Sequence, residues 1–291
     1  MKKIEAVLAL VSDDENGRRA VITGAMMARS AGASLKVLAV ARRFPIIDAF
    51  NPSGLQAEVY LDAIAGELKK RAVEDLEEAG WPDAPIEVAR GDLAVSGARV
   101  AEESGSDLLV LGTDPGGLGH AAAVSGAERL LHLAHRPVLL TTAERSESFL
   151  RILVGVDLGR ETVPALTAAA AVARIGGADV RVVHVHQAVP MLDELGVLDM
   201  DTVRREAEER LESLLGALEF PEGSRVHSEF RHGHAGPELL QAAREWEADL
   251  LVVGSHEAGF VERLFLGSTA HHVLHHAHIS TLVVPGDSSD P

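Results

Sequence analysis

An internal repeat constrains the fold of this chain more than any other feature of its sequence. The segment Ile152–Asp157 (ILVGVD) matches Val7–Ser12 (VLALVS), which lies 145 residues earlier. The segment Ala248–Gly254 (ADLLVVG) matches Ser106–Gly112 (SDLLVLG), which lies 142 residues earlier. Offsets close to half the chain length are typical of one domain present twice in tandem, and not of an array of many short repeats.

The repeat predicts two domains. With 291 residues the chain is long enough for two domains of roughly 150 residues each. We expect the first domain at residues 1–145 and the second at 146–291, joined near the polar segment Ala143–Ser148 (AERSES). Hydrophobic residues make up 46% of the chain, so each half can bury a core of its own.

Apolar runs and helical periods alternate along each copy. In the second copy we expect strands at Arg151–Val156, Val180–Val185, Val226–Phe230, Asp249–Val253 and Thr281–Val284. We expect helices at Thr162–Ile175, Thr202–Leu218 and Pro237–Glu247, and a last one that contains Ala270, Val273, Leu274 and Ala277. This alternation predicts the α/β class, with a doubly wound, open parallel sheet and helices on both faces in each copy. Ligands of such sheets bind beyond the carboxyl ends of the strands.

Composition excludes several classes of function. A formal net charge of −17 argues against nucleic acid and anionic membranes as partners, since both select basic surfaces. Without cysteine there is no disulfide, thiolate chemistry or cysteine-based zinc site. No apolar run approaches the roughly 18 residues of a membrane span, and the first residues are interpreted as a strand and not as an export signal. We therefore expect a cytoplasmic protein.

A candidate ligand site follows the fourth strand of the second copy. There Gly254 ends an apolar strand, and a loop leads to Gly267, Ser268 and Thr269 before the last helix. Glycine lets a backbone approach a ligand closely, and a helix N-terminus presents N–H groups to an anion. With Ser268 as the expected helix cap, the segment predicts a phosphate cradle.

These residues resemble the universal stress protein family. The family motif is Gly, two residues, Gly, nine residues, Gly, then Ser or Thr, between the fourth strand and the fourth helix. Here Gly254, Gly267 and Ser268 stand at the first, third and fourth places, and Asp157 closes the first strand of the copy. The resemblance covers both copies and implies sheets of strand order 3-2-1-4-5. It also implies a stress-response protein that binds or senses ATP or another adenine nucleotide, accompanied by Mg²⁺, as some members of the family do.

Carried over by position, the resemblance implies a role for each site residue. Asp157 would face the ribose and adenine edge, Val185 would meet the base through its backbone, and Gly254, Gly267, Ser268 and Thr269 would hold the phosphates. Glu257 occupies the place of the second motif glycine, with Gly259 two residues on. A carboxylate there opposes a triphosphate electrostatically.

The first copy departs further from the motif. Pro115 stands at the second glycine, Val124 replaces the glycine before Ser125, and Ser12 replaces the aspartate of the first strand. Proline has no N–H, and valine blocks close approach of a ligand to the backbone. We therefore predict a degenerate motif in the first copy and nucleotide binding only in the second.

Other interpretations of the same residues stay open. The glycines and Ser268 could form a turn and a cap without ligand, and Asp157 could brace the loop Leu158–Thr162. On the last helix His271, His275 and His278 would form one stripe, which is either a metal site or a solvated face. No general base is evident, so we expect at most slow ATP hydrolysis.

The alternative function is a ligand-free structural or interaction protein in which the duplicated fold serves assembly. In either case we expect the two copies to form a pseudo-dimer within the chain, because duplication often internalises a two-fold interface. A homodimer of the whole chain is a further alternative.

Overall fold

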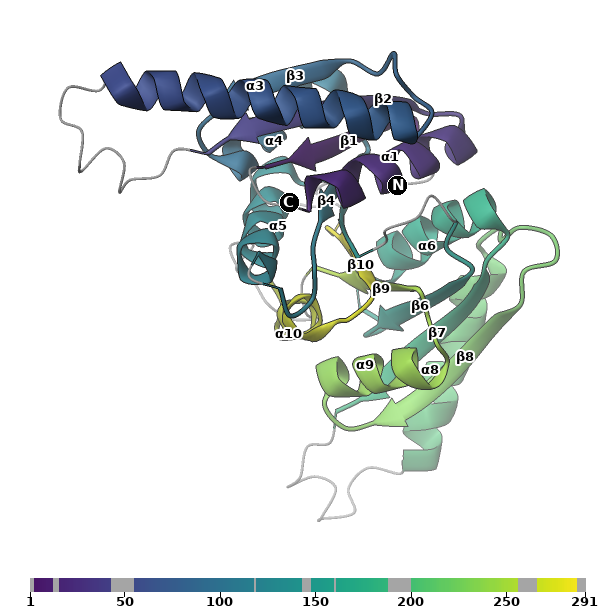
Figure 1. The fold of residues 1–291 in the computed structure, drawn as a ribbon. Helices are drawn as coiled ribbons and strands as arrows, with labels where there is room; N and C mark the ends of the chain where they lie inside the picture. The colour runs from purple at the N-terminus through teal and green to yellow at the C-terminus, as the bar shows by residue number, and fades with distance from the viewer. Residues whose placement is uncertain are drawn as a thin grey trace. The chain divides into compact units, whose positions relative to one another are not determined.

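The computed structural model describes residues 3–12, 16–42, 55–117, 119–142, 148–159, 161–187, 200–255 and 266–286. It divides into two compact units, Lys3–Ser148 and Phe149 to the end of the chain. Each unit is described by itself below. Figure 1 labels most of the helices and strands.

The first unit alternates strands and helices. Its elements are β1 (Ala6–Val11), α1 (Gly17–Ala31), β2 (Ser34–Ala41), α3 (Leu55–Glu78), β3 (Ile86–Arg90), α4 (Leu93–Ser104), β4 (Leu108–Gly112), α5 (His120–Ala134) and β5 (Val138–Thr141). The second unit repeats the pattern with β6 (Arg151–Val156), α6 (Thr162–Gly176), β7 (Asp179–His186), α8 (Met200–Gly216), β8 (Val226–His232), α9 (Ala235–Glu245), β9 (Leu250–Gly254), α10 (Ser268–His276) and β10 (Ser280–Val284).

Both units contain a parallel sheet of the expected order. In the first unit the strands lie in the order β3-β2-β1-β4-β5, and in the second β8-β7-β6-β9-β10. The described strand pairs of both units are parallel. Numbered within each copy, both orders read 3-2-1-4-5, so the predicted fold class is confirmed. The order reverses between β6 and β9, which is where such a sheet opens a crevice for ligands.

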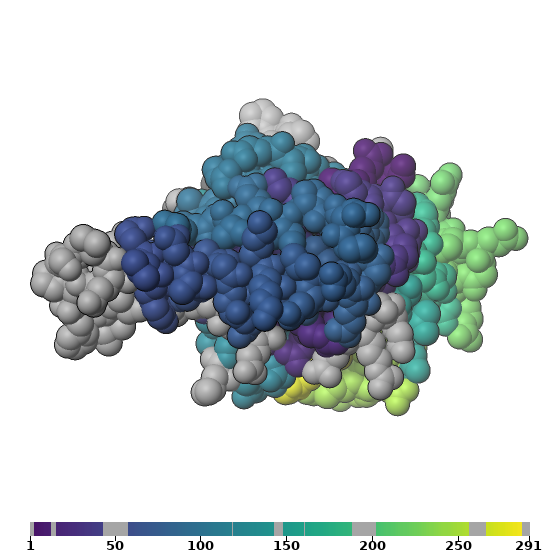
Figure 2. Space-filling model, turned by 45° about the horizontal axis from the view of Figure 1, so that its top comes forward, coloured from purple at the N-terminus to yellow at the C-terminus, as the bar shows by residue number. Residues whose placement is uncertain are grey.

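Helices cover both faces of each sheet. In the first unit α1 and α3 pack together on one face, while α4 and α5 pack together on the other. In the second unit α9 and α10 form such a pair, and α6 packs on β6, β7, β9 and β10. The outer surface of α3 is in view in Figure 2, and Val59 and Tyr60 are exposed on it.

The composition of the strands explains why the sheets form. Strands β1, β4 and β9 are apolar runs whose residues are almost all buried, as parallel strands with helices on both faces require. Strand β10 is buried throughout. Helix α6 is rich in alanine, and its small side chains let it lie close to the sheet with ten of its residues buried. Gly177 ends this helix in the left-handed conformation at φ 67°, as the sequence predicted from Gly176-Gly177.

The duplication extends to individual polar contacts. In the first unit Asp107 accepts hydrogen bonds from the backbone N–H groups of Glu5 (2.8 Å) and Ala6 (3.0 Å). In the second unit Asp249 does the same for Leu150 (2.8 Å) and Arg151 (3.1 Å). Each aspartate thereby ties the start of its fourth strand to the start of its first.

A cross-strand ion pair is also repeated. Lys36 on β2 pairs with Glu87 on β3 at 2.7 Å, and Arg181 on β7 pairs with Glu229 on β8 at 2.9 Å. Opposite charges on neighbouring strands stabilise a chosen register. The conserved placement of these contacts in both units shows that one structural plan is used twice.

Asp179 at the start of β7 supports a prediction on pH. It accepts hydrogen bonds from the Arg225 backbone (3.0 Å) and guanidinium Nε (3.0 Å). These hydrogen bonds hold the pKa of the Asp179 carboxyl below its ordinary value of 3.8. The unfolded chain then binds the proton more readily, so this contribution to stability is present above that value and is lost as the pH falls through the folded pKa.

We expect Asp179→Asn to flatten the acid side of the stability profile. In urea denaturation between about pH 5 and pH 3, the free energy of unfolding of the variant should fall less steeply than that of the parent chain. Asp83→Asn, at an exposed aspartate of the first unit, is the control. Equal slopes for Asp179→Asn and the parent would contradict this role of Arg225.

Candidate nucleotide site

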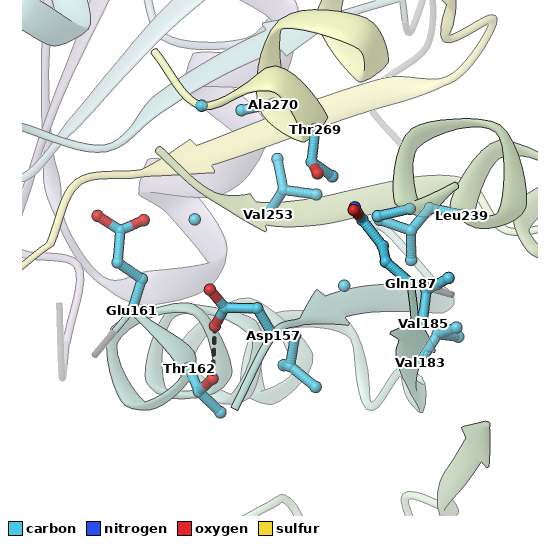
Figure 3. A pocket seen from close by; sticks show the side chains of 15 residues that line it. Asp157, Glu161, Thr162, Val183, Val185, Gln187, Leu239, Val253, Thr269 and Ala270 are labelled. Carbon is cyan, nitrogen blue, oxygen red and sulfur yellow. Dashed lines mark hydrogen bonds between the residues drawn. The ribbon is translucent and has the colours of Figure 1, made fainter. Parts of the chain in front are cut away.

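A cavity of about 230 Å³ opens in the second unit at the carboxyl ends of β6, β7 and β9. Figure 3 shows the side chains that line it. The lining residues are Gly155, Val156, Asp157, Glu161, Thr162, Val183, Val185, Gln187, Ala235, Leu239, Val253, Gly254, Gly267, Thr269 and Ala270. They come from three strands and from the N-terminal ends of α6, α9 and α10. The structure thus brings together five of the predicted site residues: Asp157, Val185, Gly254, Gly267 and Thr269.

Asp157 follows β6 and is exposed at the edge of the cavity. Its Oδ1 accepts a hydrogen bond from the backbone N–H of Gly159 (2.7 Å) and another from Oγ1 of Thr162 (3.3 Å). Figure 3 shows the contact with Thr162. Between them Leu158 adopts a positive φ of 60°, which is unusual for a side chain of its size. The interpretation that Asp157 braces this loop is confirmed, and the same residue also lines the cavity.

The apolar wall of the cavity comes from β7 and α9. Val183 and Val185 are buried on one face of β7, and Leu239 of α9 is buried beside them. Gly155 on β6 makes room for α9, because a Cβ there would stand 2.6 Å from Cδ1 of Leu239. This wall is apolar, as most of the lining of a small-molecule site is.

The glycine motif forms the opposite side. Gly267 is extended at φ −60° and ψ 151°, and its N–H donates to the carbonyl of Ser255 at 2.7 Å. Helix α10 begins at Ser268, and its first internal hydrogen bond runs from the His271 N–H to the Gly267 carbonyl (2.9 Å). Thr269 lies in the first turn, ahead of that bond, where backbone N–H groups point out of the helix. The motif therefore aims a helix N-terminus at the cavity.

Two of the predictions made from the sequence of this segment are wrong. Ser268 does not cap the helix: the cap position is Gly267, and Ser268 is exposed as the first helical residue. The helix ends at His276, so His278 lies beyond it and does not continue the predicted stripe. The rings of His271 and His275 do lie together on α10, with centroids 4.3 Å apart. Glu257 lies outside the described residues.

Glu161 is a site residue that the sequence did not indicate. It precedes α6 at the cap position, where its side chain makes no capping hydrogen bond. Its carboxylate instead reaches β9 and accepts a hydrogen bond from Oγ of Ser255 at 3.3 Å. Figure 3 shows this carboxylate at the cavity edge. Only its place just after a strand end could have singled it out.

Among the described residues of the first unit, the same region is almost filled. The corresponding cavity measures about 20 Å³. Helix α5 begins at His120, four residues before Val124, whereas α10 begins directly after Gly267. Val124 is therefore buried inside a helical turn, and Ala122 and Ala123 of the added turn line what remains of the space. In the first unit an extra turn of α5 thus stands at the place where, in the second unit, the N-terminus of α10 faces the cavity.

Polar groups of the first unit are paired with one another at this edge. Oγ1 of Thr113 lies 2.8 Å from Nδ1 of His120, and Oδ1 of Asn16 accepts from Nη1 of Arg19 at 2.7 Å. The carbonyl of Asn16 lies against Gly112, where an added Cβ would stand only 1.9 Å from it. Gly112 thus serves packing, although it matches the first glycine of the motif.

Comparison with known proteins decides the family. The sequence model of the universal stress protein family matches this chain twice, at residues 3–142 and 148–285. The chain belongs to the universal stress protein family. It carries two family domains in tandem.

Curated relatives agree with this assignment. A universal stress protein of Thermus aquaticus is 32% identical over 137 residues, which is 47% of this chain and 98% of the relative. A universal stress protein of Mycolicibacterium smegmatis is 29% identical over 143 residues, 47% of this chain and 48% of the relative. The match spans 36% of a relative from Methanocaldococcus jannaschii and 54% of one from Synechocystis, so the chain covers about half the length of these two or less.

A solved structure has the same fold over the whole chain. A universal stress protein of Archaeoglobus fulgidus superposes with a TM-score of 0.71 at 21% identity, and the match covers 99% of this chain and 99% of that one. A universal stress protein from Pseudomonas aeruginosa gives a TM-score of 0.64 at 20% identity, over 98% of this chain and 95% of its own.

No helix among the described residues has the length and apolar character needed to cross a membrane.

Proposed function

We propose that this chain binds an adenine nucleotide in the cavity of its second unit and acts as a nucleotide-sensing protein of the universal stress type. The observation that carries the proposal is the contrast between the two cavities, about 230 Å³ in the second unit and about 20 Å³ in the first. Both units have the same strand order, so the difference is local to the site.

The chemistry of the cavity supports this ligand class. The apolar wall of Val183, Val185 and Leu239 suits the face of a purine ring. Asp157 offers carboxylate oxygens that accept hydrogen bonds from ribose hydroxyls. The first turn of α10 offers N–H groups and the positive end of a helix dipole to a phosphate. A base, a sugar and a phosphate would thus each meet a matching surface.

Binding and not turnover is the proposed activity. Asp157 is engaged with Gly159 and Thr162, and Glu161 with Ser255. A carboxylate held in this way is poorly placed to activate water, so hydrolysis of a bound nucleotide would be slow.

Titration of the purified chain with adenine nucleotides tests the proposal. We expect isothermal titration in the presence of Mg²⁺ to give a stoichiometry near one per chain, because the cavity lined by described residues measures about 230 Å³ in the second unit and about 20 Å³ in the first. Freshly purified protein should also release adenine nucleotide on denaturation, identified by mass spectrometry. A stoichiometry near two would contradict the asymmetry. Absence of binding by every adenine compound would favour the ligand-free interaction protein.

A further inference from the structure

Gln187 adds a neutral polar group to the apolar wall of the cavity. It directly follows β7, and Val183 and Val185 of that strand line the cavity together with it. Side chains two positions apart along an extended chain point to the same side, so Gln187 continues the valine wall at its outer end. Gln187 is exposed, and Figure 3 shows its side chain pointing into the cavity. Its carboxamide is therefore accessible to a ligand that packs on the wall.

The chemistry of Gln187 differs from that of the other polar side chains in the described lining. Asp157 and Glu161 are carboxylic acids. Thr162 and Thr269 each carry a single hydroxyl. A carboxamide has a donor and an acceptor side by side in one plane, and so does the edge of a purine. Proteins that read bases use glutamine in this way, with two hydrogen bonds to one adenine. Gln187 thus has the donor and acceptor set that a base edge requires.

The place of Gln187 relative to Asp157 fits one orientation of a nucleoside. Asp157 follows β6, and Gln187 follows the neighbouring strand β7. In Figure 3 Gln187 and the valine wall lie at one side of the cavity and Asp157 at the other. A ribose at Asp157 would direct the base along the wall, because the sugar and the Watson–Crick edge are at opposite ends of a purine. In adenine that edge carries N1 and the 6-amino group.

We propose that Gln187 is the base-reading residue of the cavity and pairs with the N1 and 6-amino edge of adenine. This inference rests on the proposed function and adds the side chain that recognises the base. The carboxamide oxygen of Gln187 accepts a hydrogen bond from the 6-amino group, and its Nε2 donates one to N1. The pair needs the neutral carboxamide, since a carboxylate at this place has no hydrogen to donate to N1.

Isothermal titration of the parent chain, Gln187→Leu and Gln187→Glu with adenosine and guanosine tests this role. Gln187→Leu keeps a similar size without polar atoms and should weaken adenosine by about tenfold, as the loss of two modest hydrogen bonds predicts. Gln187→Glu should also weaken adenosine, because its carboxylate faces the lone pair of N1. The same carboxylate can accept from both N1–H and the 2-amino group of guanine. The ratio of adenosine to guanosine affinity should therefore fall by at least about tenfold in Gln187→Glu.

Gln241→Glu is the matched control. Gln241 lies on α9 of the same unit, outside the described lining, and donates from Nε2 to Oε1 of Glu245 at 2.8 Å. The substitution introduces the same charge and should leave the ratio of adenosine to guanosine affinity unchanged. AMP and GMP provide a second measurement of the ratio. Both carry the same phosphate, so any repulsion between the new carboxylate and the phosphate cancels.

The outcomes separate base reading from the proposed function. If adenosine binds and neither substitution of Gln187 changes its affinity, Gln187 does not read the base while the nucleotide site stands. If Gln187→Leu weakens adenosine but Gln187→Glu leaves the ratio to guanosine unchanged, Gln187 only packs against the ligand and the base-reading role is wrong. If neither adenosine nor AMP binds the parent chain, the proposed function fails and the base-reading role with it.

Discussion

Replacement of Gly112 by alanine is expected to destabilise the first unit by about 3 kcal/mol or more. The new Cβ would stand 1.9 Å from the backbone oxygen of Asn16 and 2.8 Å from its carbonyl carbon. These are backbone atoms at the start of α1, and that oxygen already accepts the Arg19 N–H at 3.1 Å. No side chain can rotate away, so the helix must shift on the sheet, which is among the costly kinds of overpacking.

The two tryptophans of the chain allow this effect to be located. Trp81 lies in the first unit and Trp246 in the second. In a Trp246→Phe background, urea denaturation followed by Trp81 fluorescence should show a large loss of stability for Gly112→Ala. In a Trp81→Phe background the transition followed by Trp246 should shift less.

Gly254→Ala is the matched control for this prediction. Its added Cβ would meet Oε2 of Glu161 at 2.4 Å and Cβ of the same residue at 2.8 Å, both side-chain atoms. The carboxylate can rotate away, and the remaining contact with Cβ of Glu161 (2.8 Å) is longer than the 1.9 Å contact at Gly112, so the loss of stability should be smaller, about 1 to 2 kcal/mol. Equal losses for the two variants would contradict the claim that Gly112 is held by backbone packing.

Gly267→Val is expected to abolish nucleotide binding while the second unit stays folded. Gly267 is extended, a conformation that valine adopts readily, and the glycine makes no side-chain capping bond that could be lost. Gly267 lines the cavity next to Thr269 and Ala270, so we expect the isopropyl group to obstruct approach to the α10 N-terminus. We expect affinity for AMP to fall by at least about a hundredfold, while the thermal midpoint changes by only a few degrees.

Gly216→Val controls for the added side chain. Gly216 ends α8, and nothing lies within 4 Å of a Cβ built there. It does not line the cavity, so nucleotide affinity should be unchanged. If Gly267→Val binds AMP as the parent does, the cavity at the start of α10 is not the nucleotide site.

The sequence by itself determined the architecture, because duplication and hydrophobic pattern are local properties of the chain. Apolar runs such as Arg151–Val156 became strands with the predicted bounds, since burial on both faces of a parallel sheet leaves little choice of register. Two element boundaries next to the site differ from the predicted ones. Strand β8 extends two residues past the expected Phe230 to His232, and α9 begins at Ala235, two residues before the expected Pro237.

Site residues were predicted from the sequence where the residue type itself indicates a backbone conformation or a chemical role. Gly254 and Gly267 were found because glycine marks close approach of the backbone, and Asp157 because an acidic residue closed an apolar strand. Glu161, Leu239 and Gln187 were missed, since each lies on a different element and nothing in its own sequence neighbourhood indicates a cavity. These three residues lie close together only because the elements that carry them begin or end at the same edge of the sheet.

Tertiary structure alone decided how the site of the first copy is filled. The sequence indicated degeneracy in the first copy from Val124 and Pro115, but not its physical form. An added turn of α5 fills the space, and the Asn16 carbonyl packs on Gly112. The same structure placed the Glu161 carboxylate beside Gly254, 93 residues further along the chain. Contacts of that kind are fixed by the packing of helices on the sheet, and no local pattern of residues encodes them.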